Sequence, residues 1–523
     1  MIYSREHING DVRLIAEVAV IGSGAGGATI AKELSEAGRR VVVLEAGGHF
    51  TREDFNLRME FAATNMYWYG GQLITLGTPM FVIPQGKTVG GTTTINSGTC
   101  LRMSHSVLKR WHLEHGLWDI KDEELALYYA AVEEYLFVQK GDPEVLGKNA
   151  TLFLEGAKSL GFSGGILPRN AKDCEGYGVC CFGCPTDAKQ SANISYIPDA
   201  VKAGCDVYTG VTVDELVLQG GRVTGAKGRF AGGNGNGSSG PTIEVSADVV
   251  VLAAGAFHSP RMLLAQGLCN SSGEVGRNLT IHPCSPTVAV MDEKIGNPKG
   301  VPQATYVDEF ADDGIMLEGG TVPPLGVAMN LPYKGRRLAE FMSGYPNTAM
   351  FGGMLSEHCS TGTVKLHPRD RQRYVITYNL RGDDVRRFRF MTEIMAEVWF
   401  RLGAKSVFTP TVSFPDMLPS DLKRFKRQKP KASDYIAVSA YHPLGTCRMG
   451  DDPERSVVQH TGETWDIPGL FICDGSIVPM SLGVNPQLTI FALAMRCAGF
   501  VDEELEKLAG RQAGGRESSS DLR

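Results

Sequence analysis

The opening segment of the chain changes from a continuous apolar run to helical spacing and back again. Residues 17–21 are mostly apolar, residues 25–37 place small and apolar side chains at helical spacing, and residues 41–44 are again β-branched and aliphatic. This order, within about 30 residues, is typical of a βαβ unit, whose two strands lie parallel in one sheet. The sequence therefore predicts the start of a parallel sheet that helices cover on its faces.

Two later apolar runs extend this sheet from distant parts of the chain. Residues 249–255 and residues 470–474 are short and largely apolar, as buried parallel strands are. The segments 225–230 and 242–245 flank a loop rich in glycine, asparagine and serine (231–241), which predicts a hairpin with a flexible tip. One sheet is thus expected to be assembled from segments that lie far apart in the sequence.

The segment 290–430 has a different pattern. Stretches such as 363–367 and 374–380 alternate apolar and polar residues, which is typical of half-buried antiparallel strands. A long helical pattern follows over 384–402, and another covers 123–136. We therefore predict an antiparallel sheet with helices, separate from the parallel sheet.

The turn after the first predicted strand carries a dinucleotide-binding fingerprint. Gly22, Gly24 and Gly27 fit the pattern G-x-G-x-x-G between a strand and a helix. In this pattern the first glycine permits the tight turn, the second lets the backbone approach a pyrophosphate, and the third lets helix and strand pack closely. Glu45, at the end of the next strand, is placed to accept hydrogen bonds from ribose hydroxyls. The fingerprint alone does not separate NAD from FAD.

Composition and charge exclude several classes of protein. The 523 residues are 43% hydrophobic and 21% charged, and the net charge of -6 leaves no basic footprint for nucleic acid. The start of the chain lacks the apolar centre of a signal peptide, and no run reaches the roughly 18 uninterrupted apolar residues of a membrane span. We predict a cytoplasmic protein without a transmembrane segment; export with a signal-bearing partner subunit is the alternative.

Four motifs, in order, resemble the glucose–methanol–choline (GMC) oxidoreductase family. After the fingerprint comes segment 86–96 (GKTVGGTTTIN), similar to the first family signature, and then 255–264 (GAFHSPRMLL), similar to the second. The fourth lies near the C-terminal end, in 442–450 (HPLGTCRMG) and 485–490 (NPQLTI). The resemblance extends over nearly the whole chain.

The resemblance implies an α/β (α+β) fold with a discontinuous, Rossmann-like FAD-binding domain and a substrate domain built on an antiparallel sheet. Some family members attach FAD covalently through a histidine before the signature asparagine. Ile95 stands at that position here, so the FAD is expected to be non-covalent. The expected units are an FAD-binding domain over 1–290 with a cysteine-rich insertion at about 165–195, a substrate-binding domain over 291–430, the C-terminal segment of the FAD-binding domain over 431–510, and a disordered tail over 511–523.

The resemblance also implies the catalytic residues. His442 takes the position of the base that removes the hydroxyl proton while a hydride leaves the carbon for flavin N5, and an imidazole suits this task near neutral pH. Asn485 would hold the substrate oxygen, and Pro486 would start a helix whose positive end stabilises the reduced flavin. His282 is interpreted as structural. The positions expected to contact FAD are Gly22, Gly24, Gly27, Glu45, Gly90, Gly91, Thr92, Asn96, Val213, Ala254, Asp474, Gly475 and Pro486.

A cluster of cysteines lies in the predicted insertion. Cys174, Cys180 and Cys184 resemble the segment that holds a three-iron cluster in the iron–sulfur branch of the family, and three thiolates suit a [3Fe–4S] cluster. With Cys181, four thiolates would equally suit zinc. Related long-chain alcohol oxidases also carry a cysteine-rich segment here, so the absence of any metal is the third alternative. A cluster would pass electrons singly to an acceptor such as a cytochrome or quinone.

The expected function is an FAD-dependent dehydrogenase acting on the CH–OH group of an alcohol or sugar. Its electrons would pass to an external acceptor, or to a small partner subunit. The nearest alternative is an oxidase of long-chain, sterol-like or aromatic alcohols that returns electrons to oxygen. A lyase with redox-silent FAD and a flavin-bearing electron carrier are alternatives from other classes. The substrate depends on segment 290–430, in which no motif constrains it.

Overall fold

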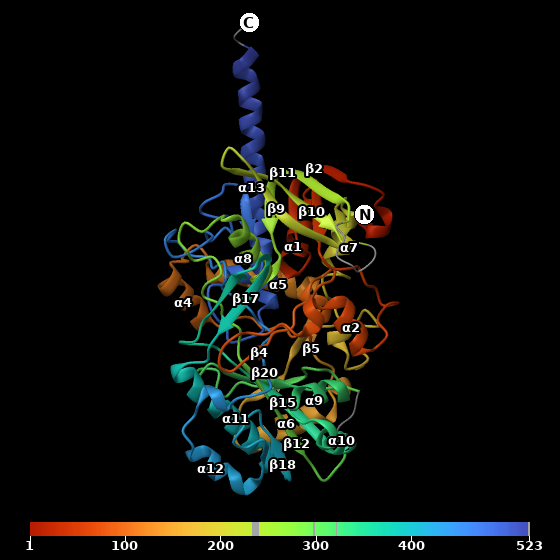
Figure 1. Ribbon diagram of the computed structural model, residues 1–523, viewed down its shortest axis with the longest axis vertical. Coiled ribbons are helices and arrows are strands. Elements are labelled where there is room, and N and C mark those ends of the chain that lie inside the picture. The colour runs from red at the N-terminus through yellow and green to blue at the C-terminus, as the bar shows by residue number, and fades with distance from the viewer. Residues whose placement is uncertain (233–239, 296–298, 321, 521–523) are drawn as a thin grey trace.

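The computed structural model describes residues 1–232, 240–295, 299–320 and 322–520, with the backbone alone for residues 330 and 512–520. The described residues form two large sheets, which lie toward opposite ends of an elongated molecule (Figure 1). The N-terminus lies at the end that holds the first sheet, and the last helix projects from the same end. Each sheet has its own hydrophobic core.

The first sheet has eight strands and is parallel through its centre. β2 lies between β3 and β11, and all three run in the same direction, with pairs such as Val18↔Val41 and Val20↔Val251. β9 and β10 continue the sheet as an antiparallel hairpin. The order is β1 (Ile2–Tyr3), β8 (Asp206–Thr209), β3 (Val41–Glu45), β2 (Val12–Ile21), β11 (Thr242–Leu252), β10 (Arg222–Phe230) and β9 (Val211–Gln219), with β21 (Leu470–Ile472) paired to β11.

β11 is long enough to pair with two different strands along one edge. Its first half pairs antiparallel with β10 up to Ser246↔Gly225, and its second half pairs parallel with β21 from Val250↔Leu470. The predicted hairpin around 231–241 is thus present, although residues 233–239 of its tip lie outside the described residues. The prediction that distant segments share one sheet is confirmed.

Helices cover this sheet as the βαβ pattern predicted. α1 (Ala25–Glu36) packs against α7 (Tyr196–Lys202) and α13 (Gln487–Ser520), and α13 packs against α5 (Asp122–Tyr135). Small side chains near the start of α1 let it lie close to the strands, and Ile30 and Leu34 are buried in the first core. α13 continues as helix to Ser520, whereas a disordered tail was expected from 511; residues 521–523 lie outside the described part of the chain.

The second sheet has nine strands and is antiparallel except where β20 meets β4. α11 (Gly382–Arg401) packs over β12 and β15, and α6 (Lys148–Ser159) lies beside it. The order is β19 (Asp416–Met417), β18 (Ser406–Phe408), β12 (Cys284–Val290), β15 (Thr348–Leu355), β14 (Ile315–Gly319), β13 (Thr305–Val307) and β6 (Gly164–Ile166), with β20 (Val438–Ser439) between β12 and β4 (Phe81–Val82).

The second sheet differs from what the sequence predicted in two respects. β4, β6 and β12 come from the range 1–290, which was expected to form the FAD-binding domain alone. The alternating runs over 363–367 and 374–380 do pair, as β16 (Gly362–His367) and β17 (Asp370–Tyr378), but they form a separate two-stranded sheet beside α8 (Gly255–Gln266). The alternation of apolar and polar residues indicates that one face of a strand is buried. It does not indicate which sheet the strand joins.

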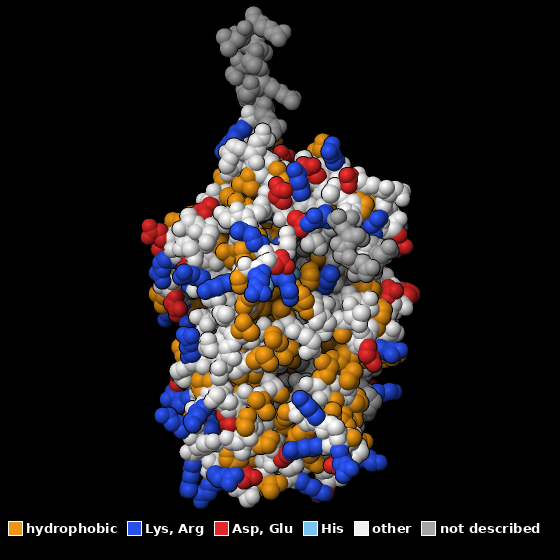
Figure 2. Space-filling view, in the orientation of Figure 1, with side chains coloured by type: hydrophobic (Ala, Val, Ile, Leu, Met, Phe, Trp, Pro, Cys, Tyr) orange, Lys and Arg blue, Asp and Glu red, His pale blue; other side chains and the backbone are white. Residues whose placement is uncertain are grey.

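Shorter elements complete the fold between the two sheets and on the surface. Hydrophobic side chains gather over the middle of the face in Figure 2, and lysine and arginine gather toward the end that holds the second sheet. Within the described residues no helix is both long and apolar enough to cross a bilayer. The remaining elements are α2 (Met59–Met66), α3 (Thr92–Ile95), α4 (His105–His115), α9 (Pro324–Asn330), α10 (Gly335–Ser343), α12 (Leu422–Arg427), β5 (Val138–Lys140) and β7 (Pro168–Asn170).

Candidate active site

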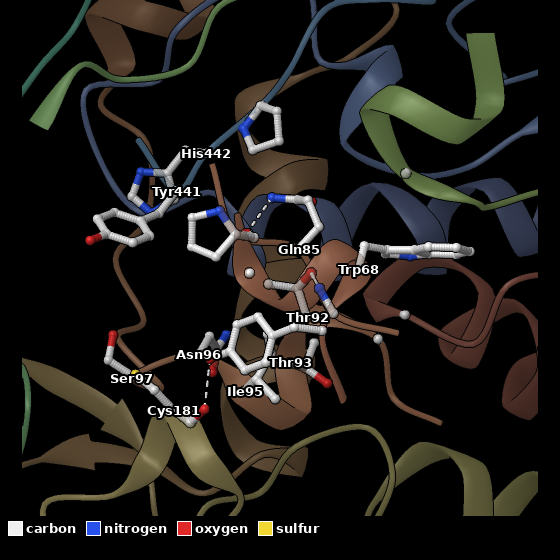
Figure 3. Close-up of a pocket in the computed structure, with 18 of the residues that line it drawn as sticks. Trp68, Gln85, Thr92, Thr93, Ile95, Asn96, Ser97, Cys181, Tyr441 and His442 are labelled. Atoms are coloured by element: carbon white, nitrogen blue, oxygen red, sulfur yellow. Dashed lines mark hydrogen bonds between the residues drawn. The ribbon is translucent and has the colours of Figure 1, made fainter. Parts of the chain in front are cut away.

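A cavity of about 760 Å³ takes its walls from both halves of the molecule. The turn between β2 and α1 forms one part of the wall, and β14 and β15 of the second sheet form another. In Figure 3, His442 and Tyr441 lie together on one side, across the space from Thr92 and Asn96. The volume lies within the roughly 300–1,000 Å³ of pockets that bind cofactors and other small molecules.

The fingerprint turn is held by contacts that leave no room for side chains. Gly22 has a φ of 99°, and a Cβ there would lie 2.4 Å from the carbonyl oxygen of Ala253. A Cβ on Gly27 would lie 2.0 Å from the Gly22 oxygen, as expected for the glycine that lets helix and strand pack. Gly26 was not among the predicted residues, yet a Cβ there would lie 1.7 Å from the Cys473 oxygen. The N-terminal end of α1 is therefore packed tightly between the ends of β11 and β21.

Glu45 uses both carboxylate oxygens within the chain. Oε2 accepts hydrogen bonds from the Ser23 N–H (2.9 Å) and Ser23 Oγ (2.6 Å), and Oε1 accepts from the Gly47 N–H (2.7 Å). Burial raises the pKa of this carboxyl, and the three hydrogen bonds oppose the rise. Oε1 keeps a lone pair for a ribose hydroxyl. Glu45 thus also ties the fingerprint turn to β3, a role that the sequence pattern did not indicate.

The first signature forms a second glycine turn that lies against the fingerprint turn. Gly91 has a φ of 54°, and a Cβ there would lie 2.8 Å from the Cα of Gly24. The Gly90 N–H donates to Ser23 Oγ (3.1 Å), which joins the two turns. α3 begins directly afterwards at Thr92. The two motifs are thus adjacent in space and shape one wall of the cavity.

Asn96 connects the first signature to the C-terminal motif. Its Nδ2 donates to Gln487 Oε1 (2.7 Å), and Gln487 Nε2 donates in turn to the Thr99 carbonyl (2.7 Å). Both Asn96 and Gln487 line the cavity. The asparagine of the signature therefore fixes the head of α13 relative to the glycine turns.

Asp474 holds the head of α8. Its Oδ2 accepts from the Gly255 N–H (2.8 Å) and from Ser259 Oγ (2.5 Å), and its Oδ1 accepts from the Ser476 N–H (2.7 Å). Burial raises the pKa of the Asp474 carboxyl, and these donors oppose the rise. The second signature and the segment after β21 are therefore joined by one carboxylate at the cavity wall.

Most of the predicted FAD positions share this cavity. Gly27 and Gly90 do not line it, and instead hold the two glycine turns in place. The predicted positions that do line it are Gly22, Gly24, Glu45, Gly91, Thr92, Asn96, Val213, Ala254, Asp474, Gly475 and Pro486.

Three long helices begin at the cavity wall. α1 starts at Ala25, α8 at Gly255 and α13 at Gln487, and all three residues line the cavity. The first N–H groups of a helix have no partner within the helix, and they carry the positive end of its dipole. A pyrophosphate and a flavin that becomes anionic on reduction suit such a wall. The size and the donors of the cavity therefore fit FAD.

His442 and Asn485 meet at the head of α13. His442 Nε2 lies 3.4 Å from Asn485 Nδ2, and the same nitrogen of Asn485 donates to Glu318 Oε1 (3.1 Å). Asn485 is 5% exposed, and within the described residues its Oδ1 has no hydrogen-bond partner. A buried carbonyl oxygen without a donor costs free energy, and it leaves Asn485 with an unused acceptor beside the cavity.

His282 contacts His442, which its interpretation as a structural residue did not anticipate. Its Nε2 accepts hydrogen bonds from the N–H groups of Leu482 (3.1 Å) and Gly483 (3.1 Å), and burial lowers its pKa well below the ordinary range. The neutral ring therefore carries its proton on Nδ1, 3.1 Å from His442 Nδ1.

His442 has a partner at each ring nitrogen. Its Nδ1 faces His282, and its Nε2 faces the Asn485 amide, whose nitrogen can only donate. Burial lowers the pKa of His442 to about 4, so the ring is neutral near pH 7.

Glu318 lies beside Asn485 in the cavity wall, and no sequence motif marked it. It lies on β14 in the cavity wall and is 8% exposed. Its Oε1 accepts from Gln303 Nε2 (2.6 Å) and Asn485 Nδ2 (3.1 Å), whereas its Oε2 has no partner within the described residues. Burial raises the pKa of Glu318 to about 7.

The three cysteines predicted as metal ligands have partners within the protein. Among the described residues, no three His, Cys, Asp or Glu side chains are grouped as metal ligands. Arg169 donates to Cys180 Sγ (3.2 Å) and Cys174 Sγ (3.9 Å), and Cys184 Sγ accepts from the Lys189 N–H (3.4 Å). The space between them is about 20 Å³, which is room for one water molecule. These residues therefore do not fit an iron–sulfur cluster.

Comparison with known proteins agrees with this geometry. Two family models described as GMC oxidoreductase match residues 63–284 and 359–494, and one described as an NAD(P)-binding Rossmann-like domain matches residues 20–72. Among solved structures, pyridoxine 4-oxidase from Mesorbium loti has a TM-score of 0.69 at 20% identity, covering 93% of this chain and 99% of its own.

Relatives in sequence extend over almost the whole chain. An uncharacterised GMC-type oxidoreductase of Mycobacterium tuberculosis is 34% identical over 95% of this chain and 76% of its own length. A long-chain-alcohol oxidase of Arabidopsis thaliana is 27% identical over 94% and 68%. The 2-methyl-1,2-propanediol dehydrogenase of Mycolicibacterium austroafricanum is 25% identical over 95% and 97%. Because the glycine turns, the signature segments and the C-terminal pair meet in one cavity as these matches require, the chain is a member of the GMC family of FAD oxidoreductases.

Proposed function

We propose that the chain oxidises the CH–OH group of an alcohol or sugar, with non-covalently bound FAD taking the hydride. The observation that supports this most is the convergence of His442, Asn485 and Glu318 on one end of the cavity, at the head of α13. When bound, FAD supplies an oxidised ring system that accepts two electrons as hydride. Ile95 offers no group for a covalent bond to that ring, which supports the non-covalent state.

In this proposal His442 takes the hydroxyl proton and Asn485 holds the substrate oxygen. Burial lowers the pKa of His442 to about 4, so its ring is neutral and can accept a proton, and its Nε2 lies 3.4 Å from Asn485 Nδ2. The amide of Asn485 stabilises the negative charge that grows on the oxygen when the hydroxyl proton leaves. The head of α13 adds its positive end, because Gln487 and Pro486 line the same wall.

An external acceptor reoxidises the flavin directly in this proposal. The relatives include both an oxidase and a dehydrogenase of alcohols, which supports alcohol oxidation and leaves oxygen, a quinone and a cytochrome as acceptors. The cysteine segment, residues 174–184, is not part of the proposed electron path, because its residues do not fit a cluster.

Anaerobic mixing of the oxidised holoprotein with a panel of alcohols tests the proposal. The panel includes a long-chain alcohol, an aromatic alcohol, a 1,2-diol and an aldose. At least one is expected to bleach the visible flavin band, because hydride transfer reduces the ring. Air is then admitted: peroxide release assigns an oxidase, and reoxidation only by an added quinone assigns a dehydrogenase. A flavin that no member of the panel bleaches contradicts the proposal and favours the lyase.

A further inference from the structure

We propose that the substrate alcohol carries an extended apolar substituent, which lies on one face of the second sheet and passes over Gly352. The inference rests on the proposed function, because it names the substrate class and a specificity-determining residue for the same reaction. It is carried by the side chains on that face of the sheet, by the open space at Gly352, and by the apolar cover that α9 provides.

The central strand β15 has one face in the core and the other in the cavity wall. Phe351 is buried in the second core, and a Cβ on Gly353 would lie 2.6 Å from the Met391 sulfur of α11. Successive residues of a strand point to opposite faces, so the alternate residues point away from α11. Those residues, all of which line the cavity, are Met350, Gly352 and Met354.

This face of the sheet reaches the catalytic pair at Gly352. In the register of the strands, Gly352 lies between Pro286 of β12 and Glu318 of β14, and directly paired residues of antiparallel strands share a face. Glu318 Oε1 accepts from Asn485 Nδ2 (3.1 Å). A substituent that extends from an alcohol held at Asn485 therefore meets the sheet at Gly352.

Gly352 leaves space on the sheet that a side chain would fill. A Cβ there would lie 3.6 Å from the carbonyl oxygen of Glu318 and 3.7 Å from that of Ser285, which are ordinary contacts. The φ of Gly352 lies outside the left-handed region, so the backbone does not require glycine. The consequence of glycine at this position is room beside the catalytic pair.

α9 covers the outer end of this face with apolar side chains. Val327 is 2% exposed and belongs to a buried cluster with Val288 of β12, and Met350 packs against that cluster. Met329 of α9 lines the cavity and is 51% exposed. Apolar side chains thus connect Gly352 with the surface at Met329, and methionine adapts to chains of different shape.

Polar side chains on these strands are engaged within the protein. Gln303 uses both ends of its amide, with Nε2 donating to Glu318 Oε1 (2.6 Å). Burial raises the pKa of the Cys284 thiol, which stays uncharged and donates to the His282 carbonyl (3.2 Å). A sugar would bury hydroxyls here without partners, at a cost in free energy, whereas the CH₂ groups of an apolar chain need none.

The dependence of flavin reduction on chain length tests the inference. Straight-chain primary alcohols from ethanol to decanol, and glucose, are mixed anaerobically with the unaltered holoprotein. Burial of one CH₂ group is worth about 0.8 kcal/mol, so the second-order rate constant is expected to rise by up to about fourfold for each added CH₂ group. Glucose is expected to react about 100-fold more slowly than decanol, or slower still, because its hydroxyls lose their hydrogen bonds to water.

Gly352→Val places a branched side chain on this face. Valine suits a strand, and its Cβ makes only ordinary contacts, so the variant should fold and bind FAD. The ratio of the rate constants for decanol and ethanol is expected to fall by about tenfold or more, because the longer chain no longer fits on the sheet. Melting temperature and FAD content are measured alongside.

Two glutamine variants of α9 form a matched pair that does not alter the sheet. Met329 lines the cavity, whereas Leu325, one helical turn earlier, is 42% exposed and is not among the residues that line it. Met329→Gln is expected to lower the ratio for decanol and ethanol by about threefold, because the chain loses apolar contact. Leu325→Gln is expected to leave the ratio unchanged, and an equal fall in both variants counts against the path along α9.

A readout that needs no turnover uses 2-methyl-2-alkanols, which have no hydrogen on the carbinol carbon and are not oxidised. Their dissociation constants, measured by titration calorimetry, are expected to fall with chain length in the unaltered holoprotein, and to fall less in Gly352→Val. Rate and dissociation constants that do not depend on chain length, or glucose that reduces the flavin faster than every alkanol, overturn the inference and leave the proposed function standing. If no alcohol reduces the flavin, the proposed function fails, and the tertiary alcohols then decide on the apolar face alone.

Discussion

At the scale of single residues, hydrogen-bond partners from distant parts of the chain surround the predicted catalytic pair. The two ring nitrogens of His442 lie 3.1 Å from His282 Nδ1 and 3.4 Å from Asn485 Nδ2. Glu318 lies in a segment without any motif, yet its Oε1 accepts from Asn485 Nδ2. Residue identity therefore indicates the reaction class, while tertiary contacts decide which residues surround the pair.

His442→Ala is expected to slow flavin reduction by alcohol by about 100-fold, because the group that takes the hydroxyl proton is lost. Stopped-flow absorption under anaerobic conditions measures the rate, and the FAD content checks that the cofactor is retained. An unchanged rate contradicts the role of His442 as base.

His442→Gln serves as the matched variant, because its side-chain amide offers an N–H but cannot act as a base. A rate as low as that of the alanine variant supports the base. Recovery toward the unaltered rate contradicts it and assigns His442 the role of a hydrogen-bond donor.

At the scale of elements, the cavity is organised by where helices begin. α1, α8 and α13 come from different parts of the chain, and each begins at a residue of the wall. Close backbone contacts hold these helix ends: Gly26 lies against Cys473, and Asp474 caps α8. An FAD site of this kind depends on the approach of backbones rather than on many specific side chains.

Gly26→Ala is expected to separate α1 from the end of β21, because the added Cβ would lie 1.7 Å from the Cys473 oxygen. Overpacking of this kind costs about 1–3 kcal/mol, so the melting temperature should fall and FAD should be lost more readily during gel filtration. Thermal unfolding and the ratio of flavin to protein absorbance measure the two effects.

Gly499→Ala is the control, because Gly499 lies within α13 and a Cβ there would meet nothing within 4 Å. Alanine favours helix over glycine by roughly 1 kcal/mol, so this variant should be as stable as the unaltered protein or more so. Equal behaviour of the two variants would contradict the tight packing at Gly26.

At the scale of the whole molecule, two sheets share one cavity. The parallel sheet contributes the glycine turns, and the antiparallel sheet contributes β14 with Glu318 and the methionines of β15. The cysteine segment packs beside this cavity, with Phe182 and Cys181 against α2 and α3. Buried Arg169 and Lys189 occupy its interior, bound to backbone carbonyls and to cysteine sulfurs.

The protein is accordingly expected to carry flavin without stoichiometric iron. Anaerobic purification followed by iron analysis and electron paramagnetic resonance of the oxidised protein checks this, because a [3Fe–4S] cluster is paramagnetic in that state. Cys174→Ser should leave flavin reoxidation unchanged, as the space beside it is about 20 Å³. If the protein contains iron at the stoichiometry of a cluster, and if Cys174→Ser loses that iron, the alternative of an iron–sulfur cluster that passes electrons to the acceptor is supported instead.

The sequence by itself determined the βαβ unit, the fingerprint turn, the sharing of one sheet by distant strands and the C-terminal pair. Each of these features follows from a local periodicity or a short motif. Strand spacing, helix spacing and glycine turns depend on residues that are close together in the sequence. Eleven of the thirteen positions that it predicted to contact FAD line the cavity.

Only the tertiary structure decided which strands build the second sheet and which residues surround His442 and Asn485. β6 and β12 join strands from much later in the chain, and His282 meets His442 across 160 positions. Glu318 acquires its raised pKa from burial beside residues of other elements. Such contacts follow from how whole elements pack, and the pattern of neighbouring residues does not contain them.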